Sequence, residues 1–291
     1  MADPFFLTGP SLISFSGGRT SAYMLWRHLQ AHGGTLPADV HVCFANTGKE
    51  REETLRFVHE CAVRWGVHVQ WLEWREPTES EHVGLRFAKV THNSAARNGE
   101  PFMRLIRRKQ YLPNSQMRYC TIELKIRVMR DFMKSLGHKT WTNTTGLRAD
   151  EMHRVWKTME RNDSGKERFV TMCPLAKAGV TVREVAEFWT RQPFDLELMS
   201  HEGNCDLCFL KGRGKRAEII RRRPDFADWW AEAEAGAKCA VPSGARFHRD
   251  ESVEALRASV LAQDMFDFNE GSDPDDEHDA ECGTWCTGEA A

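Results

Sequence analysis

The chain has 291 residues, of which 41% are hydrophobic and 28% charged, which is the composition of an ordinary globular protein with a sizeable core. No apolar run reaches the roughly 20 residues that a membrane-spanning helix needs, and the N-terminus lacks the basic and apolar segments of a secretion signal. We therefore expect a cytoplasmic protein with no membrane partner.

Charge is unevenly distributed along the chain. The formal net charge is -2, yet residues 269–291 hold eight acidic residues and no Lys or Arg, which leaves +6 on the remainder. Basic residues cluster in segments 104–130 and 211–223. Such clusters suit the phosphates of a nucleotide or a nucleic acid, or they are solvated helix faces. The low hydrophobicity and high charge of the acidic tail predict disorder.

The first part of the chain alternates short apolar runs with amphipathic segments. The pattern predicts strands at residues 12–16, 40–46 and 68–74, and helices at residues 21–33 and 51–66. This alternation is typical of a doubly wound α/β fold with a mostly parallel sheet. No internal repeat is present.

The later segments are less regular. Residues 76–117 are basic and rich in loop signals, so we expect no regular structure there. A helix is predicted at 120–137, a strand that runs into a polar turn at 138–154, and an amphipathic helix at 181–192, with Val182, Val185, Phe188 and Trp189 on one side. A helical region follows and precedes the acidic tail.

The turn S-G-G-R-T-S after the first predicted strand carries the strongest phosphate signal. A strand that leads directly into a helix places backbone N–H groups at the helix N-terminus, where anions are stabilised. Two glycines allow close approach and serine hydroxyls add donors. The turn matches neither the Walker pattern nor the dinucleotide pattern. Its candidate binding residues are Ser16, Gly17, Gly18, Arg19, Thr20 and Ser21, although a plain strand-to-helix turn remains an alternative.

Two further polar turns end in small and charged residues. Because open α/β sheets bind ligands at the carboxyl ends of their strands, both are candidate parts of the same site. An arginine in the second turn is a bidentate donor for phosphate or sulfate, or a surface residue of a capped turn. The candidates are Asn46, Thr47, Gly48 and Glu50 in one turn, and Gly146, Arg148, Asp150 and Arg154 in the other.

Nine cysteines without a secretion signal indicate metal or redox chemistry rather than a disulfide framework. Cys43 and Cys61 lie in apolar patterns and are predicted core residues. Cys205 and Cys208 form a C-x-x-C motif, and Cys282 lies in the acidic tail together with Cys286.

Taken in order, these motifs resemble the phosphoadenosine phosphosulfate reductase branch of the adenine nucleotide alpha-hydrolase superfamily, whose pyrophosphate (PP) loop the S-G-G-x-x-S turn resembles. The resemblance covers residues 11 to about 215. It rests on the segments CFANTGKEREET, RYCTIELKIRVM, TGLRADEMHR, CPLAKAGVTVREVAEFW and GNCDLCFLKG. It implies an adenine nucleotide at the three polar turns. It also implies a plan of a nucleotide-binding domain over 1–200, a C-x-x-C segment with a helical extension over 201–268, and a tail over 269–291.

The resemblance also assigns the metal and catalytic candidates. Cys120, Cys205 and Cys208 match the positions of [4Fe-4S] ligands, although three thiolates also suit zinc, and an unmetallated motif is a further alternative. Cluster-bearing relatives have two adjacent cysteines where this chain has Tyr119 and Cys120. The fourth ligand is Cys173 or Cys239, or the fourth iron has no protein ligand. A cation at Lys125 would stabilise a cluster or a phosphate, unless it is an exposed helix lysine.

The segment Glu281-Cys282-Gly283 resembles the ending that carries the nucleophilic cysteine of the reductases, which implies a catalytic set of Cys282, Arg148 and Lys125. The acidic neighbours should raise the pKa of the Cys282 thiol unless a basic site binds the tail. A tail without a catalytic role is the alternative.

Three functions stay open. The first is reduction of adenylyl sulfate or its 3′-phospho form to sulfite with a thioredoxin-type reductant. The second is an ATP- and Mg-dependent sulfurtransferase that thiolates a nucleobase, as in tRNA, or another acceptor. Thr20 stands where ATP-cleaving relatives carry an Asp that helps hold Mg²⁺. The third is a nucleic-acid-binding module without nucleotide turnover.

Overall fold

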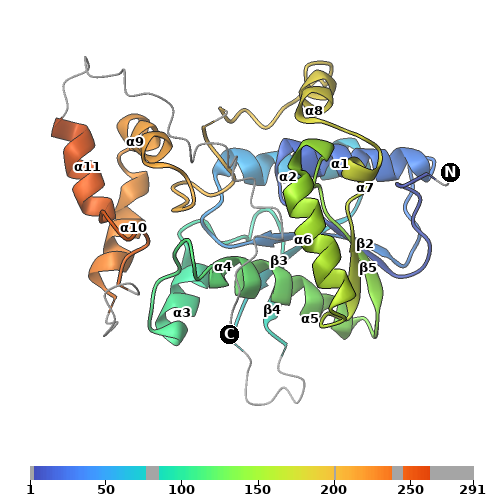
Figure 1. Cartoon of the computed structure of the whole chain (residues 1–291), viewed down its shortest axis with the longest axis horizontal. Coiled ribbons are helices and arrows are strands. Elements are labelled where there is room, and N and C mark those ends of the chain that lie inside the picture. Colours follow the sequence, from blue (N-terminus) through green and yellow to red (C-terminus); the bar gives the residue numbers. More distant parts are fainter. Residues whose placement is uncertain (1–2, 77–84, 200, 238–244, 263–291) are drawn as a thin grey trace.

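The computed structural model describes residues 3–76, 85–199, 201–237 and 245–262. Its centre is a six-stranded sheet in the order β4-β3-β2-β1-β5-β6 (Figure 1). All neighbouring strands are parallel except β3 and β4. The predicted doubly wound, mostly parallel α/β fold is therefore confirmed. The strands are β1 (Ser11–Ser14), β2 (Val40–Asn46), β3 (Val69–Trp74), β4 (Phe87–Val90), β5 (Trp141–Thr144) and β6 (Phe169–Met172).

The strand order reverses beside β1. From β1 the chain builds outward through β2 and β3, and it then returns to add β5 on the other side of β1. In the register, Ser14 lies opposite Cys43, and Ile13 lies opposite Thr144. The carboxyl ends of β1, β2 and β5 therefore meet at one edge of the sheet, where doubly wound folds bind ligands.

Helices cover both faces of the sheet. On one face, Ile13, Val42 and Phe44 pack with α1 (Arg19–Ala31) and α2 (Glu52–Arg64), and α8 (Val182–Trp189) packs against α1. On the other face, Leu12 and Cys43 pack against the helical run α4 (Tyr119–Thr121), η1 (Ile122–Arg127) and α5 (Val128–Ser135). Because both faces are buried, β1 and β2 are nearly continuous apolar runs.

The C-terminal helices α9 (Arg213–Arg222), α10 (Phe226–Ala235) and α11 (Val253–Ala262) confirm the predicted helical region. Trp230 and Leu256 of these helices belong to the same buried cluster as Leu12. The extension and the sheet therefore share a continuous core. The predicted acidic tail, with Cys282 and Cys286, lies outside the described residues.

Some expectations from the sequence were wrong. Residues 76–117 contain the edge strand β4 and the helix α3 (Glu100–Lys109), whose buried stripe is Phe102, Leu105 and Ile106. Val182 is half exposed rather than packed with its predicted stripe. The patterns also left out four segments: η2 (Ala149–Glu151), α6 (Met152–Asp163), α7 (Pro174–Lys177) and β6. No helix in the described part of the chain is long and apolar enough to cross a membrane.

Candidate functional site

The S-G-G-R-T-S turn leads from β1 into α1 as expected. Helix α1 begins at Arg19, its N-cap Gly18 makes no side-chain cap bond, and its first closed turn is the 3.0 Å bond from the Ala22 N–H to the Gly18 carbonyl. The N–H groups of Arg19, Thr20 and Ser21 therefore precede the helical ladder and point from the helix N-terminus. Such a terminus stabilises an anion.

Gly17 determines the shape of this turn. Its φ of +85° lies in the left-handed region, and a Cβ built there would be 2.7 Å from Thr54 Cγ2. Phe44 and Val58 side-chain atoms would lie 3.1 Å away. Only glycine satisfies both the backbone angle and the lack of space, so the turn is held tightly against α2.

The turn after β5 lies directly beside the first one. A Cβ built on Gly146 would be 3.3 Å from the Ser21 Cα. Arg148 donates from Nη1 to Thr20 Oγ1 at 3.1 Å and from Nε to Asp150 Oδ1 at 3.0 Å. The structure therefore brings together the glycine-rich turn and the arginine-bearing turn. Arg154, the last candidate of this turn, forms an ion pair with Glu151.

Arg19 has a structural partner. It donates from Nε to Asp195 Oδ1 at 2.7 Å and from Nη1 to the Leu198 carbonyl at 3.1 Å, and Trp189 Nε1 donates to the Arg19 carbonyl at 3.0 Å. Burial is the largest single effect and would raise the pKa of Asp195, but the hydrogen bonds from Arg19 and from the backbone N–H groups of Leu196 and Glu197, with the Arg19 charge, together hold this pKa below its ordinary value. The Arg19 guanidinium thus anchors the segment after α8 to the start of α1.

The turn after β2 is buried, and most of its polar side chains bond within it or to the adjoining strand. Asn46 Nδ2 donates to Glu73 Oε1 at 2.6 Å, and its Oδ1 accepts from the Gly48 N–H at 3.1 Å. The Thr47 N–H and hydroxyl donate to Glu50 Oε2 at 2.7 and 2.8 Å. These candidate binding residues therefore hold one another in the structure.

The C-x-x-C segment pairs with the turn after β2. Cys205 and Glu50 form an antiparallel bridge, with the Arg51 N–H donating to the Asn204 carbonyl at 2.7 Å. Asn204 Nδ2 also donates to the Ser16 carbonyl at 2.7 Å. This segment is therefore tied to two of the three polar turns, although 155 residues separate Cys205 from Glu50 and 188 separate Asn204 from Ser16.

Lys125 places the helical run that carries Cys120 beside the turn after β2. It lies on η1, five residues after Cys120, and its Nζ is 3.5 Å from Glu50 Oε1, with both side chains buried. Lys125 is therefore not an exposed helix lysine. Glu50 contacts the segments of Cys120 and Cys205 at once.

The thiols themselves do not form a ligand set. Among the described residues, no three His, Cys, Asp or Glu side chains lie close enough together to hold a metal ion. The donor chemistry of Cys120, Cys205 and Cys208 fits a cluster or zinc, whereas their described positions do not. Burial raises the pKa of the Cys173 thiol to about 12, which keeps it protonated. Cys239 lies outside the described residues.

Sequence reasoning missed a buried ion pair that supports this region. Lys49 Nζ lies 2.6 Å from Asp206 Oδ2, and Trp230 Nε1 donates to Asp206 Oδ1 at 2.8 Å. Burial is the main effect on Asp206 and raises its pKa, although Lys49 opposes the rise. The signals were the position of Asp206 inside C-x-x-C and of Lys49 inside the second turn, but neither pattern indicated a pair.

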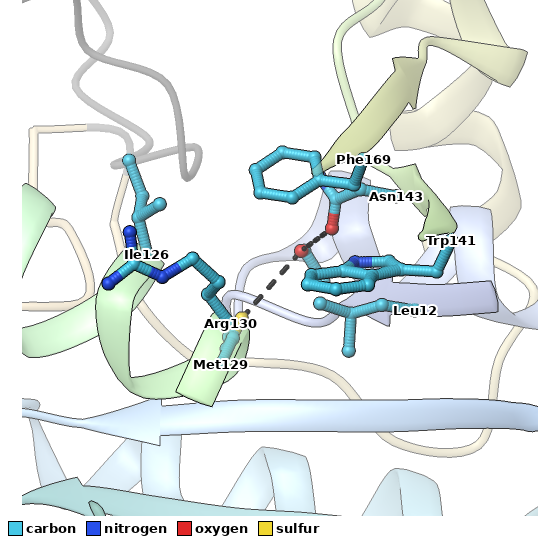
Figure 2. Close-up of a pocket in the computed structure, with 8 residues that line it drawn as sticks. Leu12, Ile126, Met129, Arg130, Trp141, Asn143 and Phe169 are labelled. Carbon is cyan, nitrogen blue, oxygen red and sulfur yellow. Dashed lines mark hydrogen bonds between the residues drawn. The ribbon is translucent and has the colours of Figure 1, made fainter. Parts of the chain in front are cut away.

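A small cavity lies between the sheet and the η1–α5 helical run (Figure 2). Leu12, Ser14, Trp141 and Asn143 line it from β1 and β5, and Ser14 Oγ donates to Asn143 Oδ1 at 2.9 Å. Its volume of about 10 Å³ leaves room for roughly one water. This cavity is therefore too small for a nucleotide.

A mostly parallel sheet whose two switch-point turns bring helix N–H groups beside an arginine defines an α/β protein of the class that binds ligands at this edge. Within that class, the chain belongs to the family of the phosphoadenosine phosphosulfate reductase domain, whose model matches residues 10–199. The family resemblance predicted from the ordered motifs is therefore confirmed.

Similar individual proteins include a phage protein and an archaeal enzyme. The uncharacterized nin region protein ORF290 of Escherichia phage lambda is 29% identical over 217 residues, which cover 70% of this chain and 67% of that protein. Among solved structures, the U34-tRNA thiolase NcsA from Methanococcus maripaludis with its [4Fe-4S] cluster has a TM-score of 0.35 and 11% identity, over 89% of this chain and 83% of that one. A TM-score this low supports no inference about function.

Proposed function

We propose that the chain is an enzyme that binds an adenine sulfonucleotide at the turns after β1 and β5 and reduces its sulfonate group to sulfite. The substrate is adenylyl sulfate or its 3′-phospho form. The observation that carries the proposal is the N-terminus of α1, uncapped by any side chain and adjacent to Arg148 at the switch point. Membership in the reductase-domain family supports it.

In this proposal the chain's own groups divide the work. The N–H groups of Arg19, Thr20 and Ser21 bind the substrate phosphate, because a helix N-terminus stabilises negative charge. Arg148 neutralises the charge that develops on the leaving phosphate, and Thr20 orients its guanidinium. Lys125 supplies a second buried positive charge next to Glu50.

The nucleophile in the proposal is Cys282, which lies outside the described residues. Its thiolate attacks the sulfonate sulfur, the bond from sulfur to the bridging oxygen breaks, and the electron pair leaves with the adenylate. A dithiol of thioredoxin type then attacks the Cys282 sulfur, and sulfite leaves with the electron pair of the S–S bond. The reductant becomes a disulfide, and the cysteine returns as a thiol.

Cys120, Cys205 and Cys208 are our candidates to hold an iron–sulfur cluster, by the chemistry of their thiols. When bound, such a group would supply an iron site to which sulfur can bind. Because the described positions do not form a ligand set, no step above depends on it. A cytoplasmic location also stays a prediction.

The second candidate is the ATP-dependent sulfurtransferase. The pairing of Cys205 with Glu50 favours it, because Asn204 in the same segment bonds Ser16 and so places a sulfur-bearing segment beside the phosphate turn. Against it, Thr20 offers a hydroxyl that already accepts from Arg148, where Mg²⁺ binding calls for a carboxylate.

The two candidates separate in one experiment. The full chain, purified without oxygen and assayed for iron and sulfide, is titrated with adenylyl sulfate, its 3′-phospho form, and ATP with Mg²⁺. The proposal expects tight binding of a sulfonucleotide and dithiol-dependent sulfite release that is lost in Cys282→Ser and kept in Cys286→Ser. Sulfite release by Cys282→Ser would remove the proposed nucleophile. Pyrophosphate release from ATP that requires an acceptor would establish the second candidate.

A further inference from the structure

One surface of the protein is strongly basic and takes no part in the proposed reaction. It is formed by β4, α3 and the η1–α5 run, which lie together on the side of the molecule opposite α8 (Figure 1). We call it the α3–η1 surface. Its cations are Arg86 of the segment before β4, Lys109 and three arginines of α3, and Arg127 of η1, where the α3 arginines are Arg104, Arg107 and Arg108.

At the centre of this surface, three cations surround one carboxylate. Glu123 is 2.8 Å from Arg127 Nη1, 2.9 Å from Lys109 Nζ and 3.2 Å from Arg86 Nη1. Burial alone would raise the pKa of Glu123, but these partners outweigh it and lower the pKa, so the carboxylate stays ionised. The group therefore keeps an excess of two positive charges.

Helix α3 adds charge that the residues described in the structure do not neutralise. Arg104 and Arg107 are exposed, stand three residues apart on one helix face, and form no ion pair with any described residue that the structure records. Arg108 forms a loose pair with Glu76, at 3.7 Å. The helix dipole accounts for cations in the last turn, but Arg104 lies a full turn earlier. The helix dipole therefore does not account for a cation at Arg104.

The α3–η1 surface and the candidate site share one helical run. Arg127 lies two residues after Lys125 on η1, and Lys125 contacts the buried Glu50 between the polar turns. A partner that binds Arg127 would therefore contact the same helical run that carries Cys120.

We propose that the α3–η1 surface binds the sugar–phosphate backbone of a nucleic acid. A nucleic-acid strand presents one negative charge about every 3.4 Å, which complements a row of cations along a helix. Guanidinium forks also match phosphate geometry, and most of these cations are arginines. This binding goes beyond the proposed reaction and does not depend on it.

The test is the salt dependence of binding. A labelled 20-nucleotide single-stranded RNA, and the DNA of the same sequence, are titrated with the full chain by fluorescence anisotropy between 50 and 200 mM KCl. The variant Arg104→Glu/Arg107→Glu should bind about 20-fold more weakly at 0.1 M salt, and the slope of log K against log salt should fall by about 1.4, as expected for two lost phosphate contacts. The control Arg183→Glu/Arg191→Glu changes the same charge at exposed positions of α8 and the segment after it, and should bind like wild type.

Three results would overturn the proposal. They are equal weakening by both double variants, no measurable binding of either strand at 50 mM KCl, and binding of polyglutamate as tight as that of RNA, which would indicate an acidic protein partner. Adenylyl sulfate binding serves as the independent control. Adenylyl sulfate should bind Arg104→Glu/Arg107→Glu as tightly as it binds wild type. If wild type does not bind adenylyl sulfate, the proposed reaction is contradicted, but the proposal of nucleic-acid binding is not.

Discussion

The turns after β1 and β2 look alike in sequence, yet the structure uses them differently. Both end a parallel strand at the same edge of the sheet with small polar residues. The turn after β1 leaves the first N–H groups of α1 without a side-chain cap, whereas the turn after β2 binds its own polar groups through Asn46, Thr47 and Glu50. The first turn can therefore receive a ligand, and the second acts as a scaffold.

The difference follows from what comes next in the chain. After β1 the chain enters α1 directly, so the helix N-terminus faces outward from the sheet edge. After β2, Gly48 with its φ of +82° redirects the chain, and residues 49–51 pair with 204–206 before α2 begins. The scaffold turn therefore holds the C-x-x-C segment in place.

The largest expected effect comes from removing the support of the scaffold turn. Asp206→Ala should lower the free energy of unfolding by about 3–5 kcal/mol, because it leaves the buried Lys49 ammonium without its carboxylate. Urea unfolding measures this loss. The control Asp228→Ala removes one of the two exposed partners of Arg257 and should cost no more than about 1 kcal/mol. Equal losses in the two variants would show that the buried pair does not support the scaffold.

Next in size is the effect of adding a side chain in the turn after β1. Gly17→Ala should destabilise the protein by about 2–4 kcal/mol, from an unfavourable positive φ together with overpacking against Thr54, and should abolish nucleotide binding. Gly34→Ala has a similar φ of +92° and no neighbour within 4 Å, so it should cost only about 1–2 kcal/mol. Thermal unfolding compares them, and an equal shift in Tm would mean that space around Gly17 does not matter.

Helix α1, which follows the turn after β1, should make the stability of the protein depend on pH. His28 of α1 has a pKa lowered to about 4, mainly by burial, against an opposing bond to the Phe5 carbonyl. A lowered folded pKa means that the unfolded chain binds more protons between pH 6.5 and 4, so stability falls as pH falls through that window. We expect a loss of about 2 kcal/mol between pH 7 and 5 from this residue.

Urea unfolding at the two pH values tests this. His28→Asn keeps a donor near the Phe5 carbonyl without titrating in this range, so its stability should change less with pH than that of wild type. A variant with the same pH dependence as wild type would assign the acid sensitivity elsewhere.

The smallest effect concerns the contact between the two switch-point turns. Thr20→Val removes the acceptor of Arg148 and should weaken sulfonucleotide binding about fivefold, from the loss of a hydrogen bond worth about 1 kcal/mol. Thr20→Ser keeps the hydroxyl and should bind like wild type in the same calorimetric titration. If both variants bind alike, Thr20 does not orient Arg148 toward the ligand.

Local patterns were enough to predict the central part of the fold. Apolar runs gave β2 with its observed bounds and placed β1 and β3 to within a few residues, and the two glycines indicated the tight turn after β1. The ordered motifs brought Thr20 and Arg148 into one candidate site before any contact was known.

The rest depended on contacts between distant residues. Nothing near Asn204 or Asp206 indicates that these side chains bond Ser16 and Lys49, because backbone pairing alone brings the segments together. The pairing of Arg19 with Asp195, 176 residues further along the chain, also could not be expected from a local pattern. Helix α3 was hidden by its basic composition, although its stripe of Phe102, Leu105 and Ile106 has helical spacing.

The π-helical turn η1 sets the phase between two neighbouring helices. An α-helix rotates about 100° per residue, so the extra residue in a π turn lets α5 keep its apolar face on the sheet while Cys120 keeps its own orientation. Deleting one residue from η1 would rotate the two halves against each other. Glu123 could then no longer bind the cations of the α3–η1 surface while Lys125 contacts Glu50. The π turn thus allows one helical run to pack against the sheet, to contact the candidate site through Lys125 and to contribute to the α3–η1 surface.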